Sequence, residues 1–208
     1  MATYASIKYN FTPPDATTSS PWGAGAMKLI KTLTASSSST LSFVDGSSDV
    51  VLDNTYKTYL FKLIEIHPQT DDKRINLAFS IDGGSNYNVA TTTSFFIAHH
   101  NEGDSASGLQ YQTGSDNAQT TGAISYSEGI GNENDQNASG DLWLFNPSST
   151  TYVKHFMGRC TRMYPGDESM VDDFTGGYVN TTSAVDAVQF SMSSGNIDSG
   201  TIKLYGIA

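Results

Sequence analysis

Imidazole and carboxylate side chains occur together in one short segment, His99-His100-Asn101-Glu102-Gly103-Asp104. These are side chains that coordinate transition metals. Adjacent residues of a strand point to opposite faces, so His99 and His100 can serve one ion only if the chain turns between them. We therefore interpret the segment as a solvated loop, with a metal site as the alternative.

A second cluster rich in oxygen atoms, NENDQN, runs from Asn132 to Asn137. Such a loop can bind Ca²⁺, but this one lacks the glycine and the distal glutamate that the EF-hand spacing requires. We predict a polar surface loop here, with a calcium site as the alternative. No residue pattern requires a cofactor or a metal, and we expect neither.

Signatures of catalysis are missing from the sequence, which has no G-x-S-x-G, S-x-x-K, H-E-x-x-H or Walker motif. Glu65 and His67 are two residues apart in an apolar run and so share a strand face, with Lys57 further along. They can form an acid/base pair, but we favour a cross-strand polar contact at a subunit boundary. We expect no enzymatic activity, with a polysaccharide-degrading jelly-roll domain as the enzymatic alternative.

Aromatic residues suggest one further site. Trp143, Phe145 and Tyr152 form either a platform that stacks on sugars or ordinary core packing, and Trp143 and Tyr152 are the candidate glycan-binding residues. Cys160 is the single cysteine, which excludes an intramolecular disulfide. We interpret it as a small core or interface residue.

The composition is typical of an all-β protein. Of 208 residues, 27 are Ser, 23 are Thr and 19 are Gly, while charged residues make up only 15%. Hydroxyl side chains suit the solvent-facing positions of strands.

The formal net charge of −10 opposes binding to nucleic acid and to anionic membranes, so we expect neither as a partner. Residues 1–15 lack the apolar stretch of a signal peptide, and no segment has ~20 consecutive apolar residues, so we expect synthesis in the cytoplasm.

Alternating apolar residues predict eight to ten strands in one domain over residues 27–208, preceded by an extended arm over residues 1–26. The clearest pattern is residues 183–207, which we interpret as a hairpin. There Val188, Phe190 and Met192 share one face, and Ile202 and Leu204 alternate with polar residues. We predict an antiparallel β-sandwich, with a jelly roll as the best single architecture. The other expected strands lie at 27–34, 41–44, 50–52, 56–67, 75–81, 95–98, 109–112, 123–126, 141–146 and 150–157, with a helical turn within 165–174.

The longest run, 56–67, is apolar on both faces: Tyr59, Phe61 and Leu63 on one, Leu60, Ile64 and Ile66 on the other. A strand of this kind is covered on both faces. In a two-layer sandwich, the second cover is an arm, a loop or another subunit. We predict interface residues in this strand and in the arm: Tyr59, Phe61, Leu63, Tyr4, Tyr9, Phe11 and Trp22.

The C-terminal block Val188–Ile207 resembles the closing hairpin of β-sandwich proteins from tailed bacteriophages, such as capsid decoration proteins and tail-fibre tips. Three earlier pieces are similar to the same pattern: 56–61 with Ile66-His67-Pro68, the strand and turn 79–84, and Gly177-Tyr178. The resemblance covers scattered parts of residues 56–207.

This resemblance implies a structural protein of the virion exterior, assembled as a homotrimer, with the major capsid protein or other virion proteins as partners. It supplies no catalytic residue. Because the chain has no long repetitive shaft, a capsid-surface decoration or cement protein fits better than a fibre. The alternative is a receptor-binding fibre tip with lectin-like glycan binding.

Overall fold

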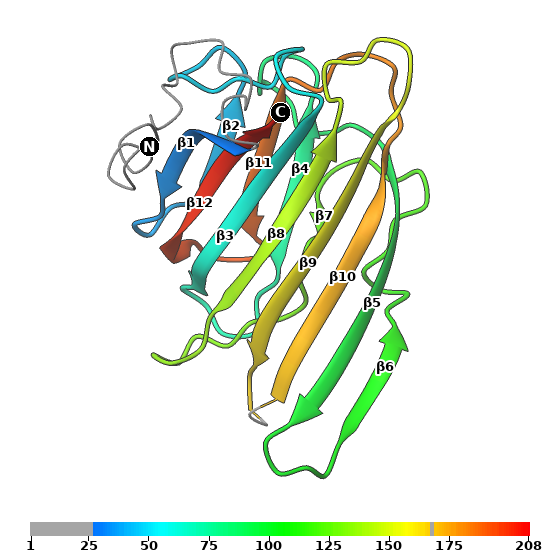
Figure 1. Ribbon diagram of the computed structural model, residues 1–208. Helices are drawn as coiled ribbons and strands as arrows, with labels where there is room; N and C mark the ends of the chain where they lie inside the picture. The colour runs from blue at the N-terminus through cyan, green and yellow to red at the C-terminus, as the bar shows by residue number, and fades with distance from the viewer. Residues whose placement is uncertain (1–26, 167–168) are drawn as a thin grey trace, which may run out of the picture.

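Two antiparallel sheets make up the described part of the chain, residues 27–166 and 169–208 of a computed structural model, and this part contains no helix (Figure 1). The larger sheet has eight strands in the order β1 (Met27–Thr34), β12 (Ile197–Ile207), β3 (Thr58–Pro68), β8 (Ala138–Phe145), β9 (Lys154–Tyr164), β10 (Ser169–Val179), β5 (Thr91–Asn101) and β6 (Ser107–Tyr111). The smaller sheet has four, in the order β2 (Thr40–Val44), β11 (Ala187–Met192), β4 (Ile75–Ser80) and β7 (Ile124–Ser125).

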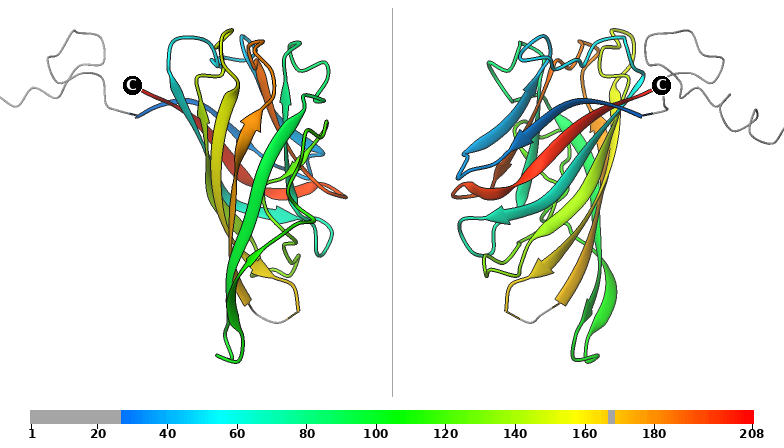
Figure 2. Two further views of the ribbon diagram at one scale, coloured as in Figure 1. Left: turned by 90° about the vertical axis from the view of Figure 1, so that its right-hand side faces the viewer. Right: turned by 60° about the vertical axis from the view of Figure 1, so that its left-hand side comes forward.

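The core lies between the two sheets. Phe43 of the small sheet meets Phe61 of the large sheet at a ring-centroid distance of 5.3 Å, and Phe79 meets Phe156 at 5.2 Å. The two sheets are seen edge-on in Figure 2. This packing of two inner faces is a β-sandwich, so the predicted all-β fold class is confirmed. A jelly roll has eight strands in two Greek keys, whereas the described residues form twelve strands divided eight and four, so this finer name is not confirmed.

The two C-terminal runs are strands with the predicted alternation, but they do not pair with each other. β11 pairs with β2 and β4 in the small sheet, whereas β12 pairs with β1 and β3 in the large sheet. The turn between them carries the chain from one sheet to the other. The predicted hairpin is therefore wrong, because both apolar faces cover the same core from opposite sides.

A bulge in β3 changes the expected faces of the longest strand. The register with β8 shifts between Leu63 and Ile66, and Glu65 inside the bulge has a positive φ of 52°. The extra residue turns Ile66 to the inner face, where it is buried, while Ile64 stays exposed on the outer face. The prediction that Ile66 shares a face with Ile64 is therefore wrong.

The predicted interface residues of this strand lie in the subunit's own core. Tyr59 and Phe61 are 0% exposed and Leu63 is 2% exposed. Their side chains pack inside the sandwich because alternation directs them to the small sheet. They cannot contact a neighbouring subunit in this fold. The other four predicted interface residues and the predicted arm, residues 1–26, lie outside the described residues.

Two other expectations are corrected. Residues 169–179 form the strand β10 and not a helical turn, and β9 begins at Lys154 and extends to Tyr164, well past the expected end at 157. Residues 50–52 are not a strand, although Val50 and Leu52 are buried in the core.

Candidate functional site

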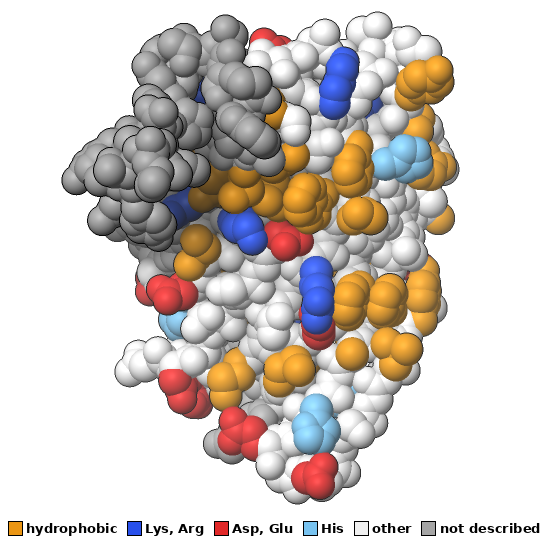
Figure 3. All heavy atoms as spheres, viewed as in Figure 1, with side chains coloured by type: hydrophobic (Ala, Val, Ile, Leu, Met, Phe, Trp, Pro, Cys, Tyr) orange, Lys and Arg blue, Asp and Glu red, His pale blue; other side chains and the backbone are white. Residues whose placement is uncertain are grey.

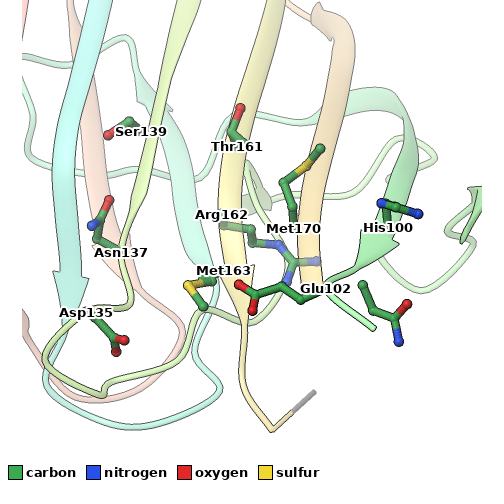
Figure 4. A pocket seen from close by; sticks show the side chains of 10 residues that line it. His100, Glu102, Asp135, Asn137, Ser139, Thr161, Arg162, Met163 and Met170 are labelled. Atoms are coloured by element: carbon green, nitrogen blue, oxygen red, sulfur yellow. The ribbon is translucent and has the colours of Figure 1, made fainter. Parts of the chain in front are cut away.

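The two clusters singled out in the sequence border one pocket on the outer face of the large sheet (Figure 4). His100 and Glu102 come from the end of β5, while Asp135 and Asn137 come from the loop before β8. The strand order β8-β9-β10-β5 places these two loops at the same end of the sheet. Met163 of β9 and Met170 of β10, which are paired in register, lie between them.

The adjacent histidines point to opposite faces of β5, as strand alternation requires. His100 lines the outer pocket, and its Nε2 lies 3.0 Å from Oδ1 of the exposed Asp104. His99 lines a different cavity on the inner face. The expected solvated loop is thus correct for residues 102–104 but wrong for the two histidines and Asn101, which belong to the strand.

Hydrogen bonds from its own polar groups hold the oxygen-rich loop in place. The backbone N–H of Asn132 donates to Asp71, and the side-chain amide of Asn132 donates to the carbonyl of Gln69. The buried Gln136 accepts from the N–H of Glu133. Within residues 27–166 and 169–208, no three His, Cys, Asp or Glu side chains are grouped so that they could hold a metal ion.

Met163, Met170 and His100 give the pocket a mixed character. It has room for about 500 Å³ but is broadly open to solvent. Arg162, which lies between Thr161 and Met163 in β9, also borders the pocket. Its guanidinium is nevertheless paired with Asp173 on the inner face. The pocket therefore offers contact area and the ring of His100, whose partner Asp104 lies outside the lining.

Glu65 and His67 do not form the acid/base pair that the spacing allowed. The His67 ring lies 3.2 Å from the carbonyl oxygen of Glu133 and 3.8 Å from the carboxylate of Asp198 in β12. Glu65 sits in the bulge, where its N–H donates to Ser139. Lys57 donates to Asn54. His67 thus makes a cross-strand polar contact, but within one subunit.

The candidate glycan-binding residues Trp143 and Tyr152 lie apart. Trp143 is half-buried on the outer face of β8, in register between Leu60 of β3 and Met157 of β9. Tyr152 is 71% exposed and lines a separate pocket with Phe145 and His155. Neither Trp143 nor Phe145 belongs to the core, so the core-packing alternative does not hold for them.

A buried charged cluster on the inner face was missed in the sequence. Arg162 (2% exposed) donates to both oxygens of Asp173 (0% exposed), at 2.7 and 3.3 Å. Arg162 also donates to the carbonyl of Gly129 at 2.5 Å, and the N–H of Glu128 donates to Asp173 at 3.1 Å. Burial raises the pKa of the Asp173 carboxyl, although Arg162 opposes the shift. No local pattern in the sequence marks this pair, because the two residues lie on different strands.

Cys160 lies fully buried in the core beside this cluster. The core was one of the two placements predicted for it. Burial raises the pKa of its thiol well above the ordinary value. The thiolate, which is the reactive form, is therefore disfavoured.

Apolar side chains gather on the outer face of the large sheet, in rows that cross the strands (Figure 3). One row contains Leu29, Tyr205, Leu60, Trp143 and Met157, each paired in register with the next. A second row contains Phe174, Phe96 and Tyr111, with the charged Arg159 paired in register with Phe174 at its end.

The second row is locally ordered. The rings of Phe174 and Phe96 stack at 4.7 Å and are nearly parallel, at 6°. The guanidinium of Arg159 lies 5.1 Å from the centre of the Phe174 ring and donates to both carboxylate oxygens of Asp172. The side chains of this row are therefore held by contacts with one another.

None of the described segments forms a helix long and apolar enough to cross a membrane. Comparison with known proteins returned no matching family model, no matching curated protein and no matching solved structure.

Proposed function

We propose that this protein is a non-enzymatic structural protein that assembles with copies of itself through the outer face of its large sheet. The observation that carries the proposal is the distribution of exposed apolar side chains. Among the described residues, eleven large apolar side chains are exposed, and eight of them lie on this one face: Met27, Leu29, Ile64, Phe96, Leu109, Tyr111, Met157 and Met170. Large exposed apolar patches mark interaction sites.

The outer face of the small sheet is an internal reference for this comparison. Its strands place Ser42 of β2, Gln189 and Ser191 of β11, and Asn76 of β4 toward solvent. The amide of Gln189 donates to the hydroxyl of Ser42. Val44, Ala78 and Ala187 share this face, but its larger side chains are mainly polar, whereas the outer face of the large sheet carries large apolar residues that gain from being covered.

The charges on the apolar face favour a second copy as the partner. The whole chain carries −10, so two copies repel each other. The rows around the apolar residues nevertheless contain Lys62, Lys203 and Arg159 with only Asp141 and Asp172 among them. A face that is locally balanced in charge can meet its own copy with little repulsion.

The available area is sufficient. At about 4.8 Å between strands and about 3.3 Å per residue, the large sheet offers a face on the order of 1,000 Å². A stable contact buries about 800 Å² per partner. Association through this face would also leave the polar small sheet directed to solvent.

The resemblance of the C-terminal block to bacteriophage β-sandwich proteins, which concerns its sequence and not the hairpin that the two strands do not form, supports a place on the virion exterior. We propose a capsid-surface decoration or cement role as a homo-oligomer, bound to the major capsid protein or to other virion proteins. Trp143 belongs to the apolar row, which favours this role over glycan binding by a fibre tip.

Light scattering after size exclusion tests the self-association. We expect an oligomer for the wild type and a monomer for Met157→Arg, because a buried unpaired charge opposes the contact. The matched control, Ser191→Arg, places the same charge on the outer face of the small sheet and should leave the oligomer intact. A monomeric wild type, or equal behaviour of the two variants, contradicts the proposal.

The virion role is tested separately by quantitative mass spectrometry of purified phage particles that encode the chain. Hundreds of copies per particle are expected of a decoration protein. A few dozen copies or fewer would instead place it in a tail or fibre, and complete absence would contradict a virion role.

A further inference from the structure

A cavity of about 240 Å³ lies on the inner face of the large sheet, over strands β5, β6, β9 and β10. In Figure 1, β5 and β6 extend past the small sheet at the lower right. Ile97 and Val171 line the cavity, and with Phe95 they form a small apolar cluster separate from the main core. The cavity therefore has an apolar floor that no strand of the small sheet lines.

Polar side chains without partners surround this floor. Nδ1 of His99 is buried and has no hydrogen-bond partner in the described part of the chain. The His99 ring is held against Gly108, where a Cβ atom would come within 3.0 Å of its Cε1. Gln110 and Gln112 also line the cavity, and neither side chain makes a hydrogen bond to any described residue. Buried polar groups are normally satisfied, so the unpaired Nδ1 of His99 indicates a place for a polar ligand, and the half-buried Gln112 and the exposed Gln110 are free to bind it as well.

The charges around the cavity define what that ligand can be. Arg162 borders it, but its guanidinium is occupied by Asp173 and by the carbonyl of Gly129. Glu128 contributes a half-buried carboxyl that accepts from the hydroxyl of Ser115, and burial raises the pKa of this carboxyl. Because the guanidinium that borders the cavity is neutralised and a carboxyl is present, an anionic ligand is disfavoured. Groups that both donate and accept hydrogen bonds suit the amides, the imidazole and the carboxyl together.

We propose that this cavity binds a single neutral sugar residue, with its C–H face on Ile97 and Val171 and its hydroxyls bonded to His99, Gln110, Gln112 and Glu128. A sugar ring combines an apolar face with vicinal hydroxyls, which planar amides can bind with both their N–H and their C=O. The exposed edge of Tyr164, whose ring lies 5.8 Å from the Arg162 guanidinium, forms the rim. This site lies on the opposite face of the sheet from the proposed assembly surface, so either proposal can fail alone.

Saturation-transfer and backbone-amide NMR titrations with glucose, galactose, N-acetylglucosamine and rhamnose test the site on the full chain. We expect at least one sugar to bind and to shift the amide signals of Ile97, His99 and Val171. The double variant Gln110→Leu/Gln112→Leu should weaken that binding about tenfold, as expected when two hydrogen bonds are lost. The control Gln69→Leu, in the turn after β3, should bind as the wild type does.

The remaining outcomes overturn the proposal. They are the absence of binding by all four sugars, binding that the double variant leaves unchanged, and shifts confined to Trp143 and Tyr152. Binding of ethanolamine, an amine probe, in place of every sugar would assign the Glu128 carboxyl to a cationic ligand instead. An unchanged urea midpoint for the double variant shows that its loss of binding does not come from unfolding. Met157→Arg, which disrupts the proposed assembly surface, should leave sugar binding intact.

Discussion

Gly200 of β12 lies against the backbone of Glu65 in β3, and a Cβ atom at position 200 would come within 2.6 Å of the Glu65 carbonyl oxygen. Gly200 has a φ of +119°, and Glu65 itself has a φ of 52°. The register between β3 and β12 shifts at the same place. The two bulges are therefore fitted to each other, and together they let both Leu63 and Ile66 face the core.

Gly200→Ala should destabilise the fold by about 2–4 kcal/mol, because the new methyl group meets backbone atoms and alanine is strained at this φ. Urea unfolding followed by fluorescence measures the change. Gly83→Ala is the matched control, since Gly83 also has a positive φ but has no atom within 4 Å of its Cβ position. It should lose only about 1 kcal/mol. Equal losses at both positions would show that the contact with Glu65 is unimportant.

The Arg162–Asp173 pair predicts a strongly coupled response to mutation. Arg162→Met leaves the Asp173 carboxylate buried and without its partner, which should cost about 3–5 kcal/mol. The double variant Arg162→Met/Asp173→Leu removes both charges and should lie within about 2 kcal/mol of the wild type. A double-mutant cycle by urea unfolding checks this, and additive losses from the two single variants would contradict it.

Glu128 makes stability depend on pH with a defined sign. Burial raises the pKa of its carboxyl above the ordinary value of 4.5, while Arg74 and Arg162 oppose the shift. Between the ordinary value and the raised one, the folded state binds more protons than the unfolded state. The contribution of Glu128 to the free energy of unfolding should therefore grow as pH falls through the raised pKa.

Urea unfolding of the wild type and Glu128→Gln across this pH range measures the effect. The difference between the two proteins should change with pH in the window just above 4.5, because glutamine does not titrate. The exposed Glu102→Gln serves as the control and should follow the wild type. A constant difference between Glu128→Gln and the wild type would contradict the prediction.

The strands that could be predicted from the sequence are those whose inner faces are apolar. Ile75, Leu77 and Phe79 alternate with polar residues, and β4 is found there. β10 was missed because its inner positions include Asp173, Thr175 and Gly177. Asp173 is tolerated inside only because Arg162 of β9 neutralises it, and that contact is invisible to a local pattern.

Pairing between strands was less predictable than the strands themselves. A turn of Gly, Asn and Ser between two alternating runs is the usual mark of a hairpin, yet 193–196 crosses between the sheets. The shared pocket of the His100 and Asp135 clusters likewise depends on the order of β8, β9, β10 and β5. Neither feature follows from spacing along the chain, because both are decided by non-local pairing.

Salt should strengthen self-association through the outer face. Each copy carries −10, and the repulsion between copies is screened when the Debye length falls from about 10 Å at 0.1 M to about 3 Å at 1 M salt. The apolar rows around Met157 and Phe96 lose nothing to screening, because their contribution comes from burial. Analytical ultracentrifugation should therefore show a lower dissociation constant at high NaCl concentration. Ser191→Arg should follow the same trend, whereas Met157→Arg should stay monomeric at every salt concentration. Weaker association of the wild type at high salt would contradict the prediction, because it would mean that ion pairs, and not the apolar rows, hold the copies together.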